Sequence, residues 1–329
     1  MRSRKSHILI ISPALKNANN GNWHTALRWS RFLKDTCNVA IATEWTPSNK
    51  DSAPDALVAL HARRSADAII RFAAHYPGRP LILVLTGTDL YRDIAIDTSS
   101  QQALEVASHL VVLQQEGIAA LPEALRAKCR VIFQSATTLR PGVPNRTRFD
   151  IVVVGHMRAE KDPLTAMRAL ELVPGGLPVR LIHIGNALEE KYLHAARELM
   201  ARNANYKWLG GLARGAARQR IKRARAMVIS SLIEGGANVV IEAMTSGVPV
   251  LASAISGNIG MLGRDYAGYF PAGDAEALAA LIARSRDDAD FLAHLGRQCA
   301  RRAPLFSPAR EKREVIKLIS SCMKRPRLP

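Results

Sequence analysis

The sequence predicts an α/β protein built from two doubly wound parallel-sheet domains. Along most of the 329 residues, short β-branched and aliphatic runs alternate with amphipathic stretches at helical spacing. That alternation is typical of parallel strands joined by helical crossovers. It pauses once, at residues 137–149, where Pro141, Gly142, Pro144 and Asn145 stand among three arginines. This composition indicates a linker, and the chain length fits a domain on either side of it.

Six buried strands are expected before the linker. They are His7–Ser12, Val39–Thr43, Ala56–Leu60, Leu81–Leu85, His109–Leu113 and Arg130–Phe133, with helices at Asn22–Thr36, Ala66–Ala74 and Gln101–Ser108. Continuous apolar strands of this kind are covered by helices on both faces of a sheet. We therefore expect an N-terminal Rossmann-like domain over residues 1–147. The first apolar run is interpreted as a strand and not as a signal peptide.

A second series of strands and helices follows the linker. Its expected strands are Ile151–Val154, Val179–Ile184, Tyr206–Leu209, Ala226–Ser230, Val250–Ala252 and Ala267–Phe270. Its expected helices are Leu164–Leu172, Leu188–Asn203, Ala216–Arg225, Val239–Thr245, Ala275–Ser285, Asp290–Arg302 and Ala309–Met323. They predict a C-terminal Rossmann-like domain over residues 148–305 and a last helix, within 306–329, that packs back on the first domain. Ligands of such sheets bind beyond the carboxyl ends of the strands, so we expect the two domains to face a cleft.

The net charge of the chain indicates which kinds of partner it can bind. The formal net charge is +18, which suits nucleic acid, anionic lipid or small phosphorylated molecules. Basic residues are densest at 197–225 and 301–329, which are interpreted as solvated helix faces. Aromatic residues make up only 5% of the chain, which is few for base-stacking platforms. Nucleic acid is therefore not an expected partner.

The cysteines and the apolar runs exclude several classes. The four cysteines, Cys37, Cys129, Cys299 and Cys322, are too far apart in sequence for a redox pair or a zinc knuckle. We expect them to be core residues of a cytoplasmic protein without a metal site. No apolar run is long enough to span a bilayer.

The segment Ser230–Val250, SSLIEGGANVVIEAMTSGVPV, is the sharpest local pattern in the chain. It follows an expected strand and opens an expected helix, with Asn238 suited to cap that helix. Free backbone amides at a helix start bind anions such as a diphosphate. Glu242 is placed to accept hydrogen bonds from a ribose diol, and Glu234 to reach a sugar further along the ligand. On spacing alone, a loop with ordinary surface acids is an equal alternative.

A resemblance to a known family favours the ligand site. The two glutamates with seven residues between them, then Ala243-Met244, Gly247 and Val248-Pro249-Val250, resemble the signature of family 4 glycosyltransferases. Those enzymes have the GT-B fold, with a nucleotide sugar between two Rossmann-like domains. The resemblance implies that Glu234 contacts the donor sugar and Glu242 the ribose. It also implies that the backbone of Gly235, Gly236 and Ala237 borders the diphosphate, with Asn238 beside it.

A second segment, Val154–Asp162, follows the first strand of the second domain and supports the same resemblance. In the family, a lysine of this loop neutralises the diphosphate, and Lys161 matches it. A developing leaving group needs such a cation, because negative charge accumulates there. His156 stands where the family has an arginine, and Arg158 is expected to substitute for that arginine. Lys161 and Glu234 are thus the expected catalytic residues.

Other strings look like one subgroup, the selenosugar synthases (SenB type) of selenoneine biosynthesis. They include Asn19-Asn20-Gly21-Asn22-Trp23, Leu60-His61-Ala62-Arg63-Arg64-Ser65, LTGTDLYRD at Leu85–Asp93, Gln134-Ser135-Ala136 and Gly257–Gly263. Members join selenophosphate to the anomeric carbon of a UDP-sugar, typically UDP-N-acetylglucosamine (UDP-GlcNAc), and release UDP and phosphate. The resemblance implies this activity here, without a cofactor. It makes a UDP-sugar and selenophosphate the expected partners, with no obligate protein partner.

Selenophosphate is a small, multiply charged anion, so its site needs cations and backbone amides. Arg63 and Arg64 directly follow an expected strand and are placed at the centre of the clamp, whereas His61 is interpreted as a half-buried structural histidine. Further acceptor-site candidates are Gly21, Asn22, Thr86, Thr88 and Arg92. Thr86 stands where many family members have a histidine. The nucleophile is already anionic and needs no general base, so the loss of that histidine is tolerable.

Two other functions stay open from the sequence. An ordinary UDP-sugar glycosyltransferase would act on a glycan, lipid or small-molecule acceptor. A large apolar acceptor favours an exposed amphipathic helix in the first domain, and none stands out. The more distant alternative is a basic nucleic-acid-binding protein.

Overall fold

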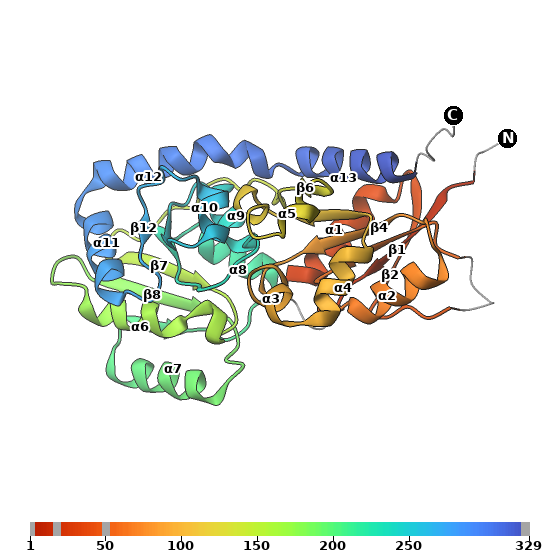
Figure 1. The fold of residues 1–329 in the computed structure, drawn as a ribbon. Coiled ribbons are helices and arrows are strands. Elements are labelled where there is room, and N and C mark those ends of the chain that lie inside the picture. The colour runs from red at the N-terminus through yellow and green to blue at the C-terminus, as the bar shows by residue number, and fades with distance from the viewer. Residues whose placement is uncertain (1–3, 16–20, 48–52, 324–329) are drawn as a thin grey trace. The chain divides into compact units, whose positions relative to one another are not determined.

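The computed structural model describes residues 4–15, 21–47 and 53–323, which fall into two compact units (Figure 1). Unit 1 comprises the chain up to Gln134 together with the residues from Pro308 onward, and unit 2 comprises Ser135–Ser307. Each unit contains a six-stranded sheet in which all neighbouring strands are parallel. The predicted fold class, α/β with two doubly wound parallel sheets, is confirmed.

The elements of unit 1 match their sequence patterns closely. Its strands are β1 (Ser6–Ile11), β2 (Cys37–Ala42), β3 (Ala56–Leu60), β4 (Leu81–Leu85), β5 (His109–Val112) and β6 (Cys129–Val131), in the spatial order β2-β1-β3-β4-β5-β6. Its α-helices are α1 (Gly21–Leu33), α2 (Ala66–His75), α3 (Ile94–Ile96), α4 (Thr98–Val106), α5 (Glu123–Arg126) and α13 (Pro308–Met323). All six strands, together with α1, α2 and α4, lie on the predicted segments.

Both faces of the unit 1 sheet are covered, because alternate residues of its central strands enter different cores. In β3, Leu57 and Ala59 pack in the core that α2 and α4 complete, whereas Ala56, Val58 and Leu60 pack in the core completed by α1 and α13. A strand buried on both faces has no polar side to display. This is why the central strands β3 and β4 are apolar throughout their length.

The last helix, α13, belongs to unit 1 and is dark blue in Figure 1. It packs against α1. Glu311 of α13 is 1% exposed and accepts hydrogen bonds from Arg28 Nε at 2.6 Å and from Trp29 Nε1 at 2.9 Å. Two donors on one buried carboxylate fix the register of α13 along α1.

Unit 2 repeats the architecture with a different strand order. Its strands are β7 (Phe149–Val154), β8 (Val179–Ile184), β9 (Tyr206–Trp208), β10 (Ala226–Ile229), β11 (Val250–Ser253) and β12 (Tyr269–Phe270), arranged β12-β11-β10-β7-β8-β9. Its α-helices are α6 (Pro163–Leu172), α7 (Glu190–Arg202), α8 (Arg214–Ile221), α9 (Asn238–Met244), α10 (Ser256–Leu262), α11 (Ala275–Asp287) and α12 (Ala289–Arg302). No described helix of either unit has both the length and the apolar character that a membrane crossing requires.

Short elements depart from the sequence predictions. A π-helical turn, η2 (Asp89–Asp93), follows β4 and leads into α3, and α10 lies between β11 and β12. The linker expected over residues 137–149 ends one residue early, because Phe149 is already the first residue of β7. The Phe149 N–H donates to the Pro178 carbonyl at 2.8 Å. Elements of one or two turns carry too few apolar repeats to show a period in the sequence.

Candidate functional site

The strand order of unit 2 locates its binding crevice. From β7 the chain proceeds to β8 and β9 on one side of the sheet, and then returns to β10, β11 and β12 on the other. The topological switch point therefore lies between β7 and β10, and ligands of doubly wound sheets bind there, beyond the carboxyl ends of the strands. Lys161 lies in the loop after β7 and Glu234 in the loop after β10. The two segments that carry the family resemblance thus meet at the switch point.

Hydrogen bonds tie these two loops into one structure. The Leu232 N–H donates to the Glu160 carbonyl at 2.9 Å, and the Ser230 hydroxyl donates to the Asp162 carbonyl at 2.8 Å. Asp162 has φ +41 and caps α6 through its side chain, which receives the Thr165 hydroxyl at 2.6 Å. This cap stabilises a left-handed conformation that is otherwise unfavourable for a residue with a Cβ atom. Lys161, one residue earlier, is held in place as a result.

Lys161 and Glu234 form an ion pair at the centre of this structure. Lys161 Nζ contacts Glu234 Oε1, and the Ser231 hydroxyl donates to the same oxygen at 2.7 Å. The Glu234 side chain is 8% exposed, so its charge depends on these partners. Ser231 was not singled out from the sequence. Its position three residues before the glutamate, just after the end of β10, is the signal that would have indicated it.

Glu242, on α9, has a cation partner of its own. Arg214 Nε, from the first residue of α8, donates to Glu242 Oε1 at 2.6 Å, and the Glu242 side chain is 4% exposed. Arg218, one turn further along α8, interacts electrostatically with both residues of this pair. Burial lowers the pKa of Arg218, and the charge of Arg214 lowers it further, whereas the charge of Glu242 raises it. The sequence motif did not include either arginine, because α8 and α9 are separate in sequence and meet only in the fold.

The backbone at the start of α9 differs from the prediction in one respect. Ala237 is the N-cap residue and Asn238 is the first helical residue, so the expected cap by Asn238 is wrong. No described residue hydrogen-bonds the buried Asn238 Oδ1, and the Ala237 N–H donates to Met261 Sδ at 3.2 Å. Helix α9 has only seven residues. The cations Lys161 and Arg214 add positive charge to that of the free amides at the start of this short helix.

Close backbone approach shapes the same loops. Gly235 and Gly236 lie between Glu234 and the helix, and a Cβ atom on Gly257 would lie 2.0 Å from the Glu234 carbonyl oxygen. Gly185, after β8, has φ +148, and a Cβ there would lie 1.9 Å from the Gly155 carbonyl oxygen. Only glycine permits these contacts, of which the first brings α10 against the loop after β10 and the second brings the loops after β7 and β8 together.

His156 and Arg158 lie in the loop that leads to Lys161. His156 Nδ1 accepts the Asn186 N–H at 3.0 Å, so a neutral ring carries its proton on Nε2. Burial lowers the pKa of His156, and the charges of Arg158 and Lys161 lower it further. His156 is therefore a neutral donor where the family has a cation. Arg158 Nε lies 3.7 Å from Glu160 Oε2, with its side chain 38% exposed.

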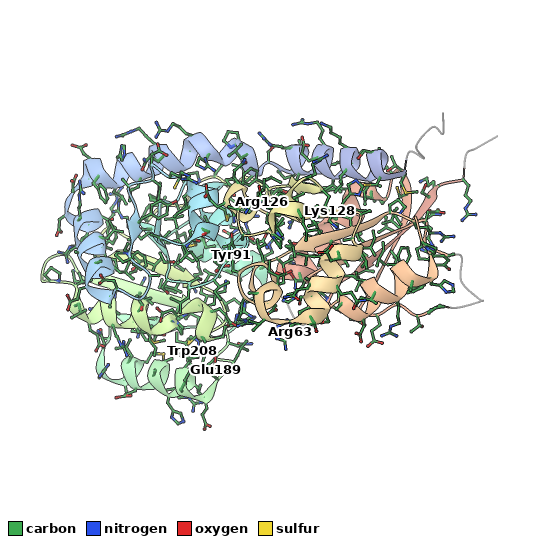
Figure 2. All side chains as sticks on the ribbon, viewed as in Figure 1. Arg63, Tyr91, Arg126, Lys128, Glu189 and Trp208 are labelled. Carbon is green, nitrogen blue, oxygen red and sulfur yellow. The ribbon has the colours of Figure 1, made fainter. Side chains whose placement is uncertain are left out.

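Unit 1 has a switch point between β1 and β3, because β2 lies on one side of β1 and the later strands on the other. Gly21 and Asn22, the first residues of α1, follow β1, but Asn19 and Asn20 lie outside the described residues. Arg63, which Figure 2 labels, follows β3. Its Nη1 lies 3.8 Å from Asp93 Oδ1 and its Nε lies 3.5 Å from Asp97 Oδ2.

The other acceptor-site candidates of unit 1 are the arginines Arg92 and Arg64 and the threonines Thr86 and Thr88. Arg92 Nε lies 3.1 Å from Asp93 Oδ1, so Arg92 and Arg63 share one acid. The exposed Arg64 side chain has no acidic partner within 4 Å among the described residues. The Thr86 N–H donates to the buried Asp89 carboxylate at 2.9 Å, and Thr88 Oγ1 lies 3.1 Å from His61 Nε2. The structure therefore ties Arg63 and Arg92 to acids and leaves Arg64 as the cation without one.

No group of three His, Cys, Asp or Glu side chains with metal-ligand geometry occurs among the described residues. The charged groups around the unit 2 switch point include the Lys161–Glu234, Arg214–Glu242 and Arg158–Glu160 pairs, together with Arg218. Cations facing carboxylates in this way suit a ligand that carries both hydroxyl and phosphate groups.

Residues 135–302, about half of the chain, match the family model described as "Glycosyl transferases group 1". No curated protein matches the chain.

Solved structures share the whole fold at low sequence identity. Anabaena Alr3699/HepE in complex with UDP and glucose has a TM-score of 0.78 at 18% identity, covering 96% of this chain and 100% of that one. Sucrose-phosphate synthase from Thermosynechococcus elongatus has a TM-score of 0.79 at 16% identity, covering 97% and 99%. A glycosyltransferase from Rickettsia africae has a TM-score of 0.72 at 15% identity, covering 98% and 99%.

Proposed function

The chain belongs to the group 1 glycosyltransferases, and we propose that it transfers the sugar of UDP-GlcNAc to the selenium of selenophosphate. In this reaction the C1–Se bond forms as the bond from C1 to the UDP oxygen breaks, and UDP leaves with the electron pair. Water then cleaves the P–Se bond and releases phosphate, which leaves a 1-selenosugar. The proposal has a donor half and an acceptor half, and each rests on its own residues.

The observation that carries the donor half is the Lys161–Glu234 pair at the switch point of unit 2. When a UDP-sugar binds, Lys161 exchanges part of its contact with Glu234 for a diphosphate oxygen and stabilises the negative charge of the leaving group. Glu234 then accepts hydrogen bonds from the sugar, while Ser231 continues to orient the carboxylate. Glu242 accepts from the ribose, with Arg214 balancing its charge. Arg158 and the neutral His156 border the diphosphate.

The printed descriptions of two related structures support a UDP-sugar donor. Anabaena Alr3699/HepE is described in complex with UDP-glucose, and in a second structure with UDP and glucose. Both share the fold of this chain. We propose that the donor of this chain belongs to the same class.

The acceptor half of the proposal rests on unit 1. Arg64 supplies the cation for the phosphate group, because its guanidinium is exposed and has no acid within 4 Å among the described residues. Thr86, Thr88 and the start of α1 at Gly21 and Asn22 supply polar groups. Arg63 and Arg92 contribute less, since each already contacts Asp93.

Among the residues that the structure describes, no free base lies near Thr88, which favours an anionic nucleophile over a sugar hydroxyl. Asp89 is occupied by backbone amides, and Asp93 by Arg63 and Arg92. Both nitrogens of His61, the nearest titratable ring, lie within hydrogen-bonding reach of a partner. Selenophosphate attacks without losing a proton, so it needs none of these groups as a base. A glycan, lipid or small-molecule acceptor remains the second candidate function.

The decisive experiment incubates the purified protein with UDP-GlcNAc and enzymatically made selenophosphate. We expect UDP release and a selenium-containing hexosamine in the mass spectrum. Lys161→Ala should abolish the product. The matched control Lys191→Ala, at an exposed lysine of α7 paired with Glu189, should not. Turnover of UDP-GlcNAc with a glycan or lipid acceptor, and none with selenophosphate, would instead support the second candidate.

A further inference from the structure

His61 adopts a backbone conformation that its residue type disfavours. It has φ +73, and among the described residues Asp162 is the only other non-glycine residue with a positive φ. Both follow a central strand at a switch point, His61 after β3 in unit 1 and Asp162 after β7 in unit 2. Residues held in this region are strained, and such strain gathers where a fold positions functional groups. Asp162 caps a helix, whereas the side chain of His61 caps none.

A buried carboxylate fixes the loop that carries His61. Asp89 is fully buried and accepts the Ala62 N–H at 3.0 Å, the Thr86 N–H at 2.9 Å and the Gly87 N–H at 2.7 Å. It therefore ties the loop after β3 to the loop after β4. The His61 N–H donates to the Val84 carbonyl at 2.9 Å. The strained residue is thus held by its surroundings and cannot relax independently.

The two ring nitrogens of His61 have different partners. Nδ1 accepts the Arg64 N–H at 3.4 Å, and Nε2 lies 3.1 Å from Thr88 Oγ1. Because Nδ1 is an acceptor, a neutral ring carries its proton on Nε2 and donates it to the Thr88 oxygen. Burial is the main reason that the pKa of His61 is lowered, against the opposing effects of Asp89 and Asp93, so the ring is neutral at pH 7.

Asp93 does not need His61 as a counter-ion. Its Oδ1 contacts Arg92 at 3.1 Å and Arg63 at 3.8 Å, while its Oδ2 lies 4.0 Å from His61 Nε2, beyond hydrogen-bonding distance. The His61 Nε2–H therefore donates its hydrogen bond to Thr88 and not to Asp93. Once the Thr88 oxygen accepts from His61, its own hydroxyl proton is oriented away from the ring. Thr88 is half-buried, so that proton can reach a ligand.

We propose that His61 is a positioning residue that orients the Thr88 hydroxyl to donate a hydrogen bond to a phosphate-type oxygen of the acceptor. This rests on the function proposed above, because it assigns the acceptor to unit 1. In this proposal the neutral pair of His61 and Thr88 supplies the directional hydrogen bond to the acceptor, and Arg64 supplies the positive charge that attracts it. His61 does not act as a base, because its Nε2 carries the proton and its Nδ1 faces a backbone amide.

The test compares four variants by steady-state kinetics, with each substrate varied separately. His61→Asn removes the Nε2 donor and keeps a residue that tolerates positive φ, whereas His61→Gln keeps a donor near the same place. Thr88→Val removes the hydroxyl, and Thr88→Ser keeps it. We expect about a tenfold rise in the KM for selenophosphate in His61→Asn and in Thr88→Val, with the KM for UDP-GlcNAc unchanged. A hydrogen bond of this kind typically contributes that much. The two conservative variants should recover most of the loss.

A double variant separates positioning from a structural role. If His61 acts through Thr88, then His61→Asn combined with Thr88→Val should be no worse than Thr88→Val alone. Losses that simply multiply, or a KM for UDP-GlcNAc that rises equally, would overturn the proposal. His194→Asn, at an exposed histidine of α7, is the matched control.

A binding measurement distinguishes failure of this inference from failure of the proposed function. In protein labelled with 15N-histidine, we expect the His61 signals of a ring protonated on Nε2, and a shift of the Nε2 signal on titration with inorganic phosphate. Thr88→Val should abolish that shift. A His61 proton on Nδ1, no shift, or an equal shift in Thr88→Val would each refute the role of His61. If the shift behaves as expected but no selenosugar forms, the positioning role stands and the proposed acceptor is wrong.

Discussion

At the scale of single residues, each of the two nearly buried carboxylates of unit 2 has a cation of its own. Glu234 is paired with Lys161, and Glu242 with Arg214. An unpaired charge is costly at such burial, so each pair contributes to the stability of unit 2. A ligand that offers hydroxyls to the acids and phosphate oxygens to the cations can replace these internal contacts.

Replacing Glu242 tests the ribose contact. Glu242→Ala should weaken UDP binding by about 1–3 kcal/mol, since a buried hydrogen bond to a charged group is lost. Isothermal titration with UDP measures this. Glu276→Ala, at an exposed acid of α11, is the control and should bind UDP normally. Unchanged UDP affinity in Glu242→Ala would remove the ribose assignment.

Replacing Glu234 tests the sugar contact. Glu234→Ala should leave the affinity for free UDP nearly unchanged and lower kcat, because its partner is the sugar and not the nucleotide. Titration with UDP and turnover of UDP-GlcNAc, measured on the same protein, separate the two effects. If UDP affinity falls as much as in Glu242→Ala, the two glutamates have been given the wrong roles.

The arginine pair after β3 gives a matched comparison. Arg64→Lys should raise the KM for selenophosphate, because lysine cannot reproduce a planar, two-pronged contact with a phosphate. Arg63→Lys should have a smaller effect, because Arg63 already contacts Asp93 and Asp97. Kinetics with selenophosphate as the varied substrate decide between them. Normal dependence on selenophosphate in both variants would move the clamp towards Asn22 and Thr86–Thr88.

At the scale of elements, strand β8 contains a histidine that couples folding to pH. His183 is 1% exposed, its Nδ1 lies 3.1 Å from the Tyr206 hydroxyl of the neighbouring strand, and burial lowers its pKa to about 4. Unfolded histidine has a pKa of about 6.5. Between these values the unfolded state binds more protons than the folded state, so stability falls as pH is lowered.

We expect the free energy of unfolding of unit 2 to be unaffected by His183 above about pH 6.5 and to fall by about 3 kcal/mol in total as pH drops to about 4. Urea unfolding at pH 7 and at pH 5 measures the effect. His183→Gln should show a smaller drop than the wild type. Burial also lowers the pKa of His61, His109 and His156, so these residues contribute to the drop in both proteins. Only the difference between the two drops therefore reports on His183. Equal drops would contradict the assignment.

At the scale of the whole molecule, the net charge of +18 suits both a nucleotide-sugar enzyme and a nucleic-acid binder. The positive charge that the proposed function needs is local, at Lys161, Arg214 and Arg64, whereas most of the other described basic residues are exposed. Surface charge of that kind gives weak, salt-sensitive attraction to any polyanion.

Ligand stabilisation distinguishes the two functions. UDP-GlcNAc at 100 times its Kd should stabilise the protein by about 2.7 kcal/mol, visible as a rise in Tm. Binding to RNA should weaken steeply between 50 and 200 mM salt, as charge-driven binding does. A protein that ignores UDP-GlcNAc and holds one RNA sequence at physiological salt would be a nucleic-acid binder instead.

The apolar runs of the sequence were sufficient to predict both parallel sheets, because central strands such as β3, β4 and β10 are buried on both faces and are therefore apolar throughout. The apolar periodicity also placed α1, α2, α6 and α11, whose core-facing residues recur at helical spacing. It did not place η2 or α10, which are too short to show a period. The assignment of Asn238 as a cap missed by one residue, because the loop geometry, and not the residue type, decides where α9 begins.

The sequence by itself determined the class of fold and the two segments, around Lys161 and Glu234, whose spacing resembles a glycosyltransferase family. The tertiary structure alone decided which side chains pair. Arg214 with Glu242, Arg63 with Asp93, and His61 with Thr88 join segments that are separate in sequence. Residue type and spacing encode local conformation and burial, whereas the direction of a charge or a hydrogen bond depends on which loops the strand order brings together. For that reason the three arginines proposed for the acceptor site, which are alike as residues, could be distinguished only in the fold.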